Sequence, residues 1–355
     1  MEDKRLEELA RTIVNYSTKV KKGEKVWIES YSHTEKLTRA IYREVLKVGG
    51  IPTLSTEFEA TELDVLKYGQ EKQFRELAEI KLENLKERAV FIGIGGRKNN
   101  HLLDGIDEKK IAQKSKADGA SLNYRVQNMK WCITRFPNKE MAKRAGMSLK
   151  SFENLYYSSC LLDWEEESRK YDNLIGVLEN KDKIKILGKN TELNFSIKGR
   201  KFCKSEGKRN MPGGEIYTAP VEDSVNGFIE FDYPVLWGKE IGGIFLKFKE
   251  GKVFEARAKK NQAGLDKLIS LDEGTKRIGE WGIGLNPAIV QYTGDTLFDE
   301  KMCKTIHLAL GTSHLNTGGK NKSATHEDII KNMSAGEIYV DNKLVMKNGV
   351  WLIGK

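Results

Sequence analysis

The 355-residue sequence lacks long apolar segments and is poor in cysteine. No stretch approaches the roughly 18 uninterrupted apolar residues that a membrane-spanning helix needs, so we expect no membrane association. The N-terminal residues MEDKRLEELARTIVNYSTKV contain no continuous apolar run of the kind found in signal peptides. The four cysteines are far apart and form no C-x-x-C pair, which is typical of buried or spectator thiols in a reducing compartment. We therefore predict a cytoplasmic protein.

Proline is also scarce, and neither a fixed-period repeat nor a low-complexity tract is present. These absences argue against disordered, fibrous and solenoid architectures. Apolar residues make up 39% and charged residues 31% of the chain, a balance that is typical of a compact globular protein. At about 150 residues per domain, this length favours two domains.

Charge of one sign is not concentrated in any segment. The 60 Lys and Arg residues are interleaved with 51 Asp and Glu residues, and the net charge is +9. A dispersed excess of this kind is typical of a solvated surface. Because no clustered basic arm and no recognised nucleic-acid motif accompanies it, we expect no nucleic-acid partner.

Helical and strand patterns alternate in the first part of the chain. Helical spacing of apolar residues begins near Leu6, and further helical segments are expected at 34–47 and at about 61–86. Strands are expected between them in KVWIES, GGIPTLSTE and AVFIGIGG. This alternation predicts a doubly wound α/β domain with a parallel sheet over residues 1–147.

The GIGG sequence at 93–96 resembles part of a dinucleotide-binding fingerprint but does not complete one. The third glycine is missing at the required spacing, and the following RKNNHLLDG does not open a helix. We interpret GIGG as a turn at the end of a strand.

The second part of the chain has a different pattern. Residues 148–180 are charged and periodic, which predicts one or two helices that link the domains. Residues 181–355 contain short alternating runs separated by Gly, Asn and Lys turns, which predicts a β-rich domain. KEGK and VDNKLV have the composition of hairpin tips.

Histidine is rare, yet three of the five histidines lie between residues 306 and 330. His326 and Asp328 share one side of an extended chain, because side chains alternate along a strand, and both can then reach one cation. His307 lies in the apolar run TIHLALG, where a histidine is either hydrogen-bonded in the core or directed toward a ligand. His314 lies between them and adds to the cluster.

Two glutamates upstream occupy apolar, glycine-rich surroundings. Glu215 follows a Pro-Gly-Gly loop in NMPGGEIYTAP, and Glu280 lies in IGEWGIGLNPAI. A carboxylate in such a setting is costly unless it is paired or bound to a metal. Each is therefore either a candidate metal ligand or a surface glutamate in a turn.

Four ordered motifs give this region a family resemblance. NMPGGEIYTAP, GEWGIGLNP, LFDEKMCKTIHLALG and NKSATHEDII closely resemble segments of the thermophilic-type metallo-aminopeptidases of the M29 peptidase family. The resemblance runs from about Gly188 to the C-terminus, whereas the first half agrees only in its α/β pattern.

The resemblance implies an α/β N-terminal domain, a β-rich C-terminal domain with two divalent metal ions (Zn, Co or Mn), peptide substrates and a homodimer. Two such ions would activate a water and polarise the scissile carbonyl, and Glu215 or Glu300 would transfer the proton. Carried over by position, the ligands would be Glu215, Glu280, His307, His326 and Asp328, with Glu300 at or beside the metals.

His314 departs from the family pattern. Seven residues after the metal-binding histidine, members of the family typically have a tyrosine that is assigned to stabilising the tetrahedral intermediate. An imidazole can donate a hydrogen bond to an oxyanion, but it can also bind metal. We therefore expect a catalytic role for His314 while its type stays open.

Three functions fit these residues. The leading hypothesis is a two-metal aminopeptidase. His307, His326 and Asp328 also compose the two-histidine, one-carboxylate set of mononuclear iron enzymes, and ring-cleaving dihydroxypyridine dioxygenases resemble this peptidase fold. A catalytically impaired, peptide-binding relative is the third.

Overall fold

The computed structural model describes residues 3–96, 105–237 and 239–354. The chain divides into two compact units. Unit 1 comprises Met1–Leu161 with Gly207–Pro212, and unit 2 comprises Leu162–Glu206 with Gly213–Lys355. The division therefore falls inside the 148–180 segment, which folds as two helices, one in each unit.

Unit 1 contains a five-stranded sheet in which all neighbouring strands are parallel. This confirms the predicted α/β fold of the N-terminal part. In their order across the sheet, the strands are β2 (Ile51–Glu57), β1 (Lys25–Tyr31), β3 (Val90–Gly95), β4 (Lys130–Arg135) and β8 (Asn210–Met211).

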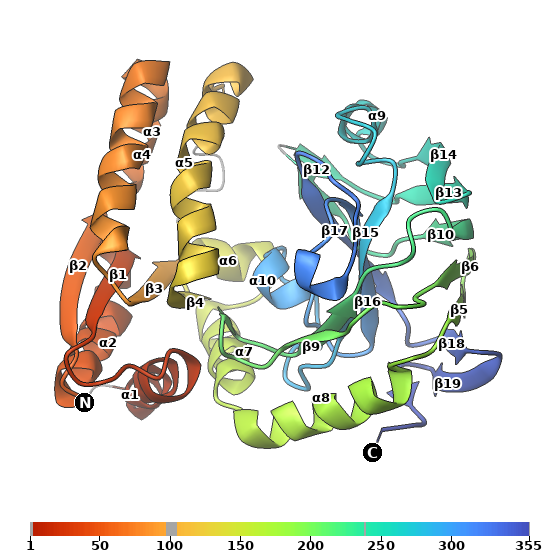
Figure 1. The fold of residues 1–355 in the computed structure, drawn as a ribbon, viewed down its shortest axis with the longest axis horizontal. Coiled ribbons are helices and arrows are strands. Elements are labelled where there is room, and N and C mark those ends of the chain that lie inside the picture. Colours follow the sequence, from red (N-terminus) through yellow and green to blue (C-terminus); the bar gives the residue numbers. More distant parts are fainter. Residues whose placement is uncertain (1–2, 97–104, 238, 355) are drawn as a thin grey trace. The chain divides into compact units, whose positions relative to one another are not determined.

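The helices of unit 1 form at least two packed groups (Figure 1). In chain order they are α1 (Lys4–Arg11), η1 (Thr12–Ser17), η2 (Ser32–Thr34), α2 (Glu35–Lys47), α3 (Glu59–Tyr68), α4 (Glu71–Lys86), α5 (Glu108–Asn128), α6 (Lys139–Arg144) and α7 (Leu149–Cys160). α1 packs on α2, which contacts β1 and β2, while α4 packs on α5. The helices expected at 34–47 and 61–86 are confirmed, the second as the pair α3 and α4.

β3 ends at Gly95, and Gly96 follows with a φ of 111°. This conformation favours glycine. The strand therefore ends within GIGG, as interpreted, although its first three residues belong to β3 and only Gly96 lies beyond it. Most of RKNNHLLDG, which we expected not to open a helix, lies outside the described residues.

Unit 2 is built mainly from antiparallel sheets, as predicted for a β-rich domain. The larger sheet has the order β14 (Lys252–Arg257), β13 (Phe245–Lys249), β10 (Asn226–Glu230), β6 (Thr191–Ser196), β5 (Lys183–Gly188), β18 (Glu337–Val340), β19 (Lys343–Lys347) and β20 (Val350–Trp351). Both predicted hairpin tips are confirmed, one between β13 and β14 and the other between β18 and β19.

A second, five-stranded antiparallel sheet carries most of the predicted site residues. Its order is β17 (His326–Asn332), β16 (Thr305–Gly311), β15 (Ile278–Gly284), β9 (Glu215–Thr218) and β7 (Cys203–Ser205). The remaining elements of unit 2 are α8 (Trp164–Leu178), β11 (Val235–Trp237), β12 (Lys239–Ile241), α9 (Gln262–Ile269), α10 (Thr296–Asp299) and η3 (Leu315–Thr317).

One face of the five-stranded sheet belongs to the core of unit 2. Trp281 in β15 is fully buried there, with its ring edge-on to Phe195 at 5.3 Å and to Phe202 at 6.1 Å between centroids. Ile216, Ile283 and Leu308 lie in the same core cluster. Burial of these side chains fixes which residues of the sheet point to the opposite face.

No helix among the described residues is long and apolar enough to cross a membrane.

Replacing Trp281 with alanine tests how strongly this core supports the sheet. We expect Trp281→Ala to lower the free energy of unfolding by about 3–5 kcal/mol, because a large buried ring is exchanged for a cavity. Phe254→Ala is a matched control, since that ring is 62% exposed and its loss should cost less than about 0.5 kcal/mol. Urea unfolding followed by circular dichroism measures both. Equal, small effects would contradict the assignment of Trp281 to the core.

Candidate metal centre

Strand register brings the predicted ligands to one face of the five-stranded sheet. In β16, His307 lies opposite Gly282 of β15 on one side and Ile330 of β17 on the other. Glu280 and Asp328 lie on either side of the same residue of β16, Ala309. Residues directly opposite each other share a face of a sheet, and alternate residues along a strand do so too.

By the same rule, Glu215 and His326 also lie on this face of the sheet. Glu215 of β9 pairs with Gly284, which is two residues from Gly282 along β15. His326 of β17 pairs with Gly311, two residues beyond Ala309 along β16. All five predicted ligand positions therefore lie on the face opposite Trp281.

Small residues on this face leave room for the imidazole and carboxylate groups. A Cβ atom on Gly282 would lie 1.9 Å from Nε2 of His307, so only glycine at this position admits the ring as it stands. Glycine in the interior of a strand often marks such a close approach.

Glu280 is at the centre of the cluster. Its Oε1 lies 3.1 Å from Nε2 of His307, and its Oε2 lies 3.4 Å from Nε2 of His314. Among the described residues, two groups of three have ligand atoms all within 4.8 Å of one another: Glu215, Glu280 and His307, and Glu280, His314 and His326. Both groups contain Glu280, which suits a carboxylate shared by two cations.

Asp328 lies beside both groups. Its Oδ1 is 3.6 Å from Nε2 of His326 and 3.9 Å from Nε2 of His307. His326 also has its Nδ1 2.7 Å from the carbonyl oxygen of Thr312. Donation from Nδ1 to this carbonyl fixes the ring and leaves Nε2 for a metal, an arrangement common among metal-binding histidines.

The charges in this cluster perturb one another strongly. Burial would lower the pKa of His307, but Glu280, Asp328 and Glu215 raise it to about 9. Burial would also lower the pKa of His326, but Asp328 and Glu280 raise it to about 10. Burial would raise the pKa of Asp328, yet the two histidines hold it below its usual range. Without a metal, the protonated imidazoles supply the positive charge that the carboxylates require.

Three buried polar atoms of the cluster have no hydrogen-bond partner: Oε2 of Glu280, Nδ1 of His307 and Oδ1 of Asp328. Buried polar atoms are normally hydrogen-bonded, so each such atom requires an explanation. Two of the three are carboxylate oxygens that face imidazole nitrogens. A mixed oxygen and nitrogen donor set of this kind fits Zn, Co or Mn, and the residues therefore fit the metal that the sequence predicts.

Glu300 differs from the other predicted ligands. It follows α10 and belongs to neither group of three. Its carboxylate contacts the ammonium of Lys301, which also lies 3.2 Å from Oε1 of Glu215. The structure thus places Glu300 beside the cluster and joins it to the cluster through a lysine.

His314 lies in the loop between β16 and η3, and its side chain is 51% exposed. Its ring is 4.9 Å from the ring of His326 and 5.4 Å from that of Tyr217, between centroids. It is the most solvent-accessible of the histidines in the cluster. A substrate that approaches from solvent would therefore meet His314 before His307.

Sequence reasoning missed Lys301 and Gly282. Lys301 is fully buried beside two acidic groups, and the only signal for it was its place next to Glu300 in a motif that resembles the family. Gly282 carried a clearer signal, because glycine is unfavourable inside a strand unless another group needs the space.

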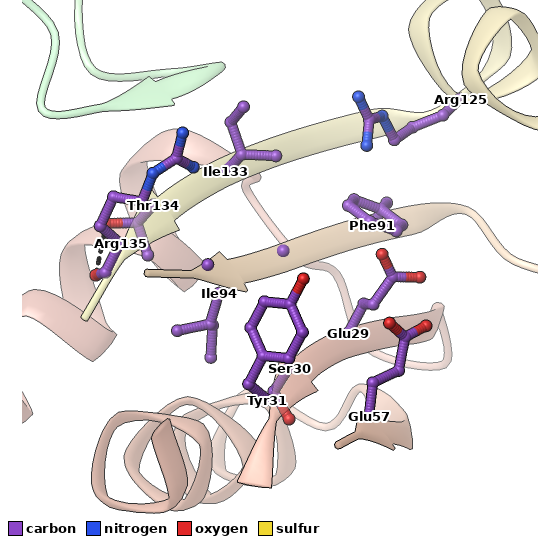
Figure 2. Close-up of a pocket in the computed structure, with 12 residues that line it drawn as sticks. Glu29, Ser30, Tyr31, Glu57, Phe91, Ile94, Arg125, Ile133, Thr134 and Arg135 are labelled. Carbon is purple, nitrogen blue, oxygen red and sulfur yellow. Dashed lines mark hydrogen bonds between the residues drawn. The ribbon is translucent and has the colours of Figure 1, made fainter. Parts of the chain in front are cut away.

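A cavity lies in unit 1, at the parallel sheet. This cavity of about 230 Å³ is lined by residues of β1 to β4 and by Arg125 of α5. Figure 2 shows the side chains of Glu29 and Glu57, from neighbouring strands, and the guanidinium of Arg125, which lies 4.8 Å from the ring centre of Phe91. Glu29 is paired with Lys81 at 2.7 Å. None of the predicted site residues lines this cavity, and all of them belong to unit 2.

The close approach of Gly282 to His307 predicts the effect of one added methyl group. Gly282→Ala should displace the imidazole and weaken divalent-metal binding by about 10-fold or more, because metal affinity depends on the orientation of each ligand. Gly176→Ala in α8 is the control, since its added Cβ would meet nothing within 4 Å. Isothermal titration of metal-free protein with Zn measures the affinities. Unchanged affinity in Gly282→Ala would show that His307 does not bind the metal.

The chain is similar to known proteins over nearly its whole length. Aminopeptidase AmpS of Bacillus subtilis is 26% identical to it in an alignment that covers 98% of each sequence. Wild-type AmpT from Thermus thermophilus superposes with a TM-score of 0.86 at 20% identity and covers 99% of each chain. 2,5-Dihydroxypyridine dioxygenase from Pseudomonas putida superposes with a TM-score of 0.61 at 14% identity, covering 98% of this chain and 96% of the other. At these identities, the two structures show a shared fold.

The model of one family matches residues 2–351, and its description is thermophilic metalloprotease (M29). The motifs that carry the resemblance in the sequence begin only at about Gly188, so the match extends the relationship to the whole first half. The chain therefore belongs to the M29 family of metalloproteases and is a peptidase.

Proposed function

We propose that the chain is an aminopeptidase that hydrolyses N-terminal residues from peptides with two divalent metal ions. The observation that carries the proposal is that two groups of three potential ligands share Glu280, which lies on the face of the five-stranded sheet opposite Trp281. Membership in a metalloprotease family and similarity to a protein named aminopeptidase AmpS support it.

The residues divide between the two ions by proximity. Glu215, Glu280 and His307 would hold one ion, and Glu280, His314 and His326 the other. Asp328 would assist, since its Oδ1 is within 3.9 Å of Nε2 in both His307 and His326. When bound, two Zn, Co or Mn ions would lower the pKa of a water molecule and polarise the scissile carbonyl.

We assign the proton-transfer role to Glu215. One of its oxygens lies 3.5 Å from Nε2 of His307 and the other faces Lys301, so the carboxylate is held in one orientation. Where the oxygen beside His307 is not itself bound to the ion, it can accept a proton from the attacking water and deliver it to the leaving amine. Glu300 is further from the histidines and supports Glu215 through Lys301.

We propose that His314 lies on the solvent-facing side of the metal centre, from which a substrate approaches. Its half-exposed ring lies within reach of Glu280 and beside His326. We infer that His314 is a metal ligand in this chain, a role that differs from the oxyanion-stabilising role of the family tyrosine.

The activity is tested directly with purified protein loaded with Co, Mn or Zn. We expect amino-acid release from aminoacyl and dipeptide substrates, its loss with a chelator, and a decrease of about 100-fold or more in Glu280→Gln, because even indirect supports of a metal ligand are worth about 10–100-fold. Glu273→Gln is the control, since this side chain is 70% exposed. No chelator-sensitive release at any metal loading would contradict the proposal.

The number of bound metal ions distinguishes two roles for His314, a metal ligand or a hydrogen-bond donor to the oxyanion. If His314 is a ligand, His314→Ala should retain about one ion per chain after dialysis where the unmodified protein retains two. Inductively coupled plasma mass spectrometry counts the ions. Two retained ions together with a lower kcat would instead identify His314 as a hydrogen-bond donor to the oxyanion.

A mononuclear iron oxygenase is the second candidate. Asp328 lies beside both His307 and His326, and the dioxygenase match has the same fold. Glu215 and Glu280 argue against it, since a two-histidine, one-carboxylate site needs no further carboxylates. One iron per chain and oxygen uptake would favour the oxygenase. Metal binding without turnover of any substrate would favour an impaired, peptide-binding relative.

A homodimer and a cytoplasmic location stay predictions of the family resemblance and of the sequence. Light scattering coupled to gel filtration measures the mass in solution.

A further inference from the structure

Lys301 is a fully buried lysine in the middle of an acidic cluster. It is 0% exposed, and its Nζ contacts Glu300 and lies 3.2 Å from Oε1 of Glu215. Burial would lower the pKa of Lys301, but Glu215 and Glu300 raise it above its ordinary value. A charge this deeply buried is retained in proteins only where it is paired.

The backbone around Lys301 is held firmly. Its carbonyl oxygen accepts a hydrogen bond from the backbone N–H of Asn286 at 3.0 Å. The side-chain amide of Asn286 donates in turn to the carbonyl of Gly213 at 2.8 Å, in the loop that leads into Glu215. Asn286 thus connects the backbone of Lys301 with Gly213, which lies two residues before Glu215.

The two oxygens of Glu215 have different partners. Oε2 faces Nε2 of His307 at 3.5 Å and belongs to the metal-binding side, whereas Oε1 faces the ammonium of Lys301. Glu300 faces the same ammonium and belongs to neither group of three potential ligands. The lysine therefore contacts Glu300 and the oxygen of Glu215 that does not face His307.

We propose that Lys301 acts as a built-in cation, which holds Glu300 and one oxygen of Glu215 in place of a metal ion and so limits metal binding at this side of the centre. The inference rests on the proposed two-metal function. Lys301 is a positioning residue, because it acts through the two glutamates and not on a substrate.

Charge balance predicts the direction of the effect. Burial and Glu215 raise the pKa of Glu300 to about 8, so its ionisation depends on a nearby cation. When both carboxyl groups are ionised and Lys301 is protonated, the three groups together carry one negative charge. Replacing the lysine with methionine, which has a similar length, leaves two negative charges and frees Glu300. A nearby cation is then bound more tightly, because the repulsion from the ammonium is gone and a new carboxylate is available.

The test is a metal titration of Lys301→Met against the unmodified protein with Zn and with Mn. We expect the weaker-bound ion to bind at least about 10-fold more tightly in the variant, the scale expected when one unit charge is removed from the surroundings of a partly buried cation. The double variant Glu300→Gln with Lys301→Met restores the net charge, so its affinity should return toward that of the unmodified protein.

Lys331→Met is a matched control for the loss of a buried lysine. Lys331 is 3% exposed in the same unit and pairs with Asp232 at 3.0 Å, away from the predicted ligands. It should leave the metal affinities unchanged. If Lys301→Met does not fold, the charge-balanced double variant still tests the inference, because a metal affinity more than about 10-fold above that of the unmodified protein would contradict it.

The outcomes distinguish this inference from the proposed function. Unchanged metal affinity in Lys301→Met, with two ions bound by the unmodified protein, would overturn the role of Lys301 alone. Absence of metal binding by the unmodified protein would overturn the proposed function, and this inference with it.

Discussion

The structure of the site depends on one electrostatic constraint, which is that several carboxylates share a sheet face that is largely closed to water. Glu215 and Glu280 are buried, and Asp328 and Glu300 are mostly covered. Carboxylates in such surroundings repel one another unless positive charge lies between them. The chain supplies part of that charge through its histidines and through Lys301, and we propose that divalent ions supply the rest. The histidines, Lys301 and the proposed metal ions can therefore each supply positive charge that these carboxylates require.

The geometry of the antiparallel sheet determines where the carboxylates and histidines of the site lie. Antiparallel register places residues from four strands on one face, while Trp281 and its neighbours on the other face are buried in the core. A shift of one residue in any of these strands would exchange the two faces, so the hydrophobic core also fixes the positions of the ligands. Glycines complete the arrangement, because His307 occupies the space that a side chain at position 282 would fill.

Much of this could be predicted from the sequence, for identifiable reasons. Alternation of helix and strand patterns predicted the parallel sheet of unit 1, and the short alternating runs predicted the β-rich unit 2. The apolar run around His307 and the spacing of His326 and Asp328 predicted strands that the structure contains. The register of the strands, and the way in which loops meet them, could not be predicted from the sequence. Contact between Lys301 and Glu215 depends on how a loop after α10 meets β9, and no local pattern carries that information.

The most direct test is a crystal structure with anomalous scattering measured at the Zn, Co, Mn and Fe edges. We predict two metal peaks per chain on the sheet face, both within coordination distance of Glu280, one next to His307 and the other next to His326. A single iron peak bound by His307, His326 and Asp328, or no peak on this face at any metal concentration, would contradict this prediction.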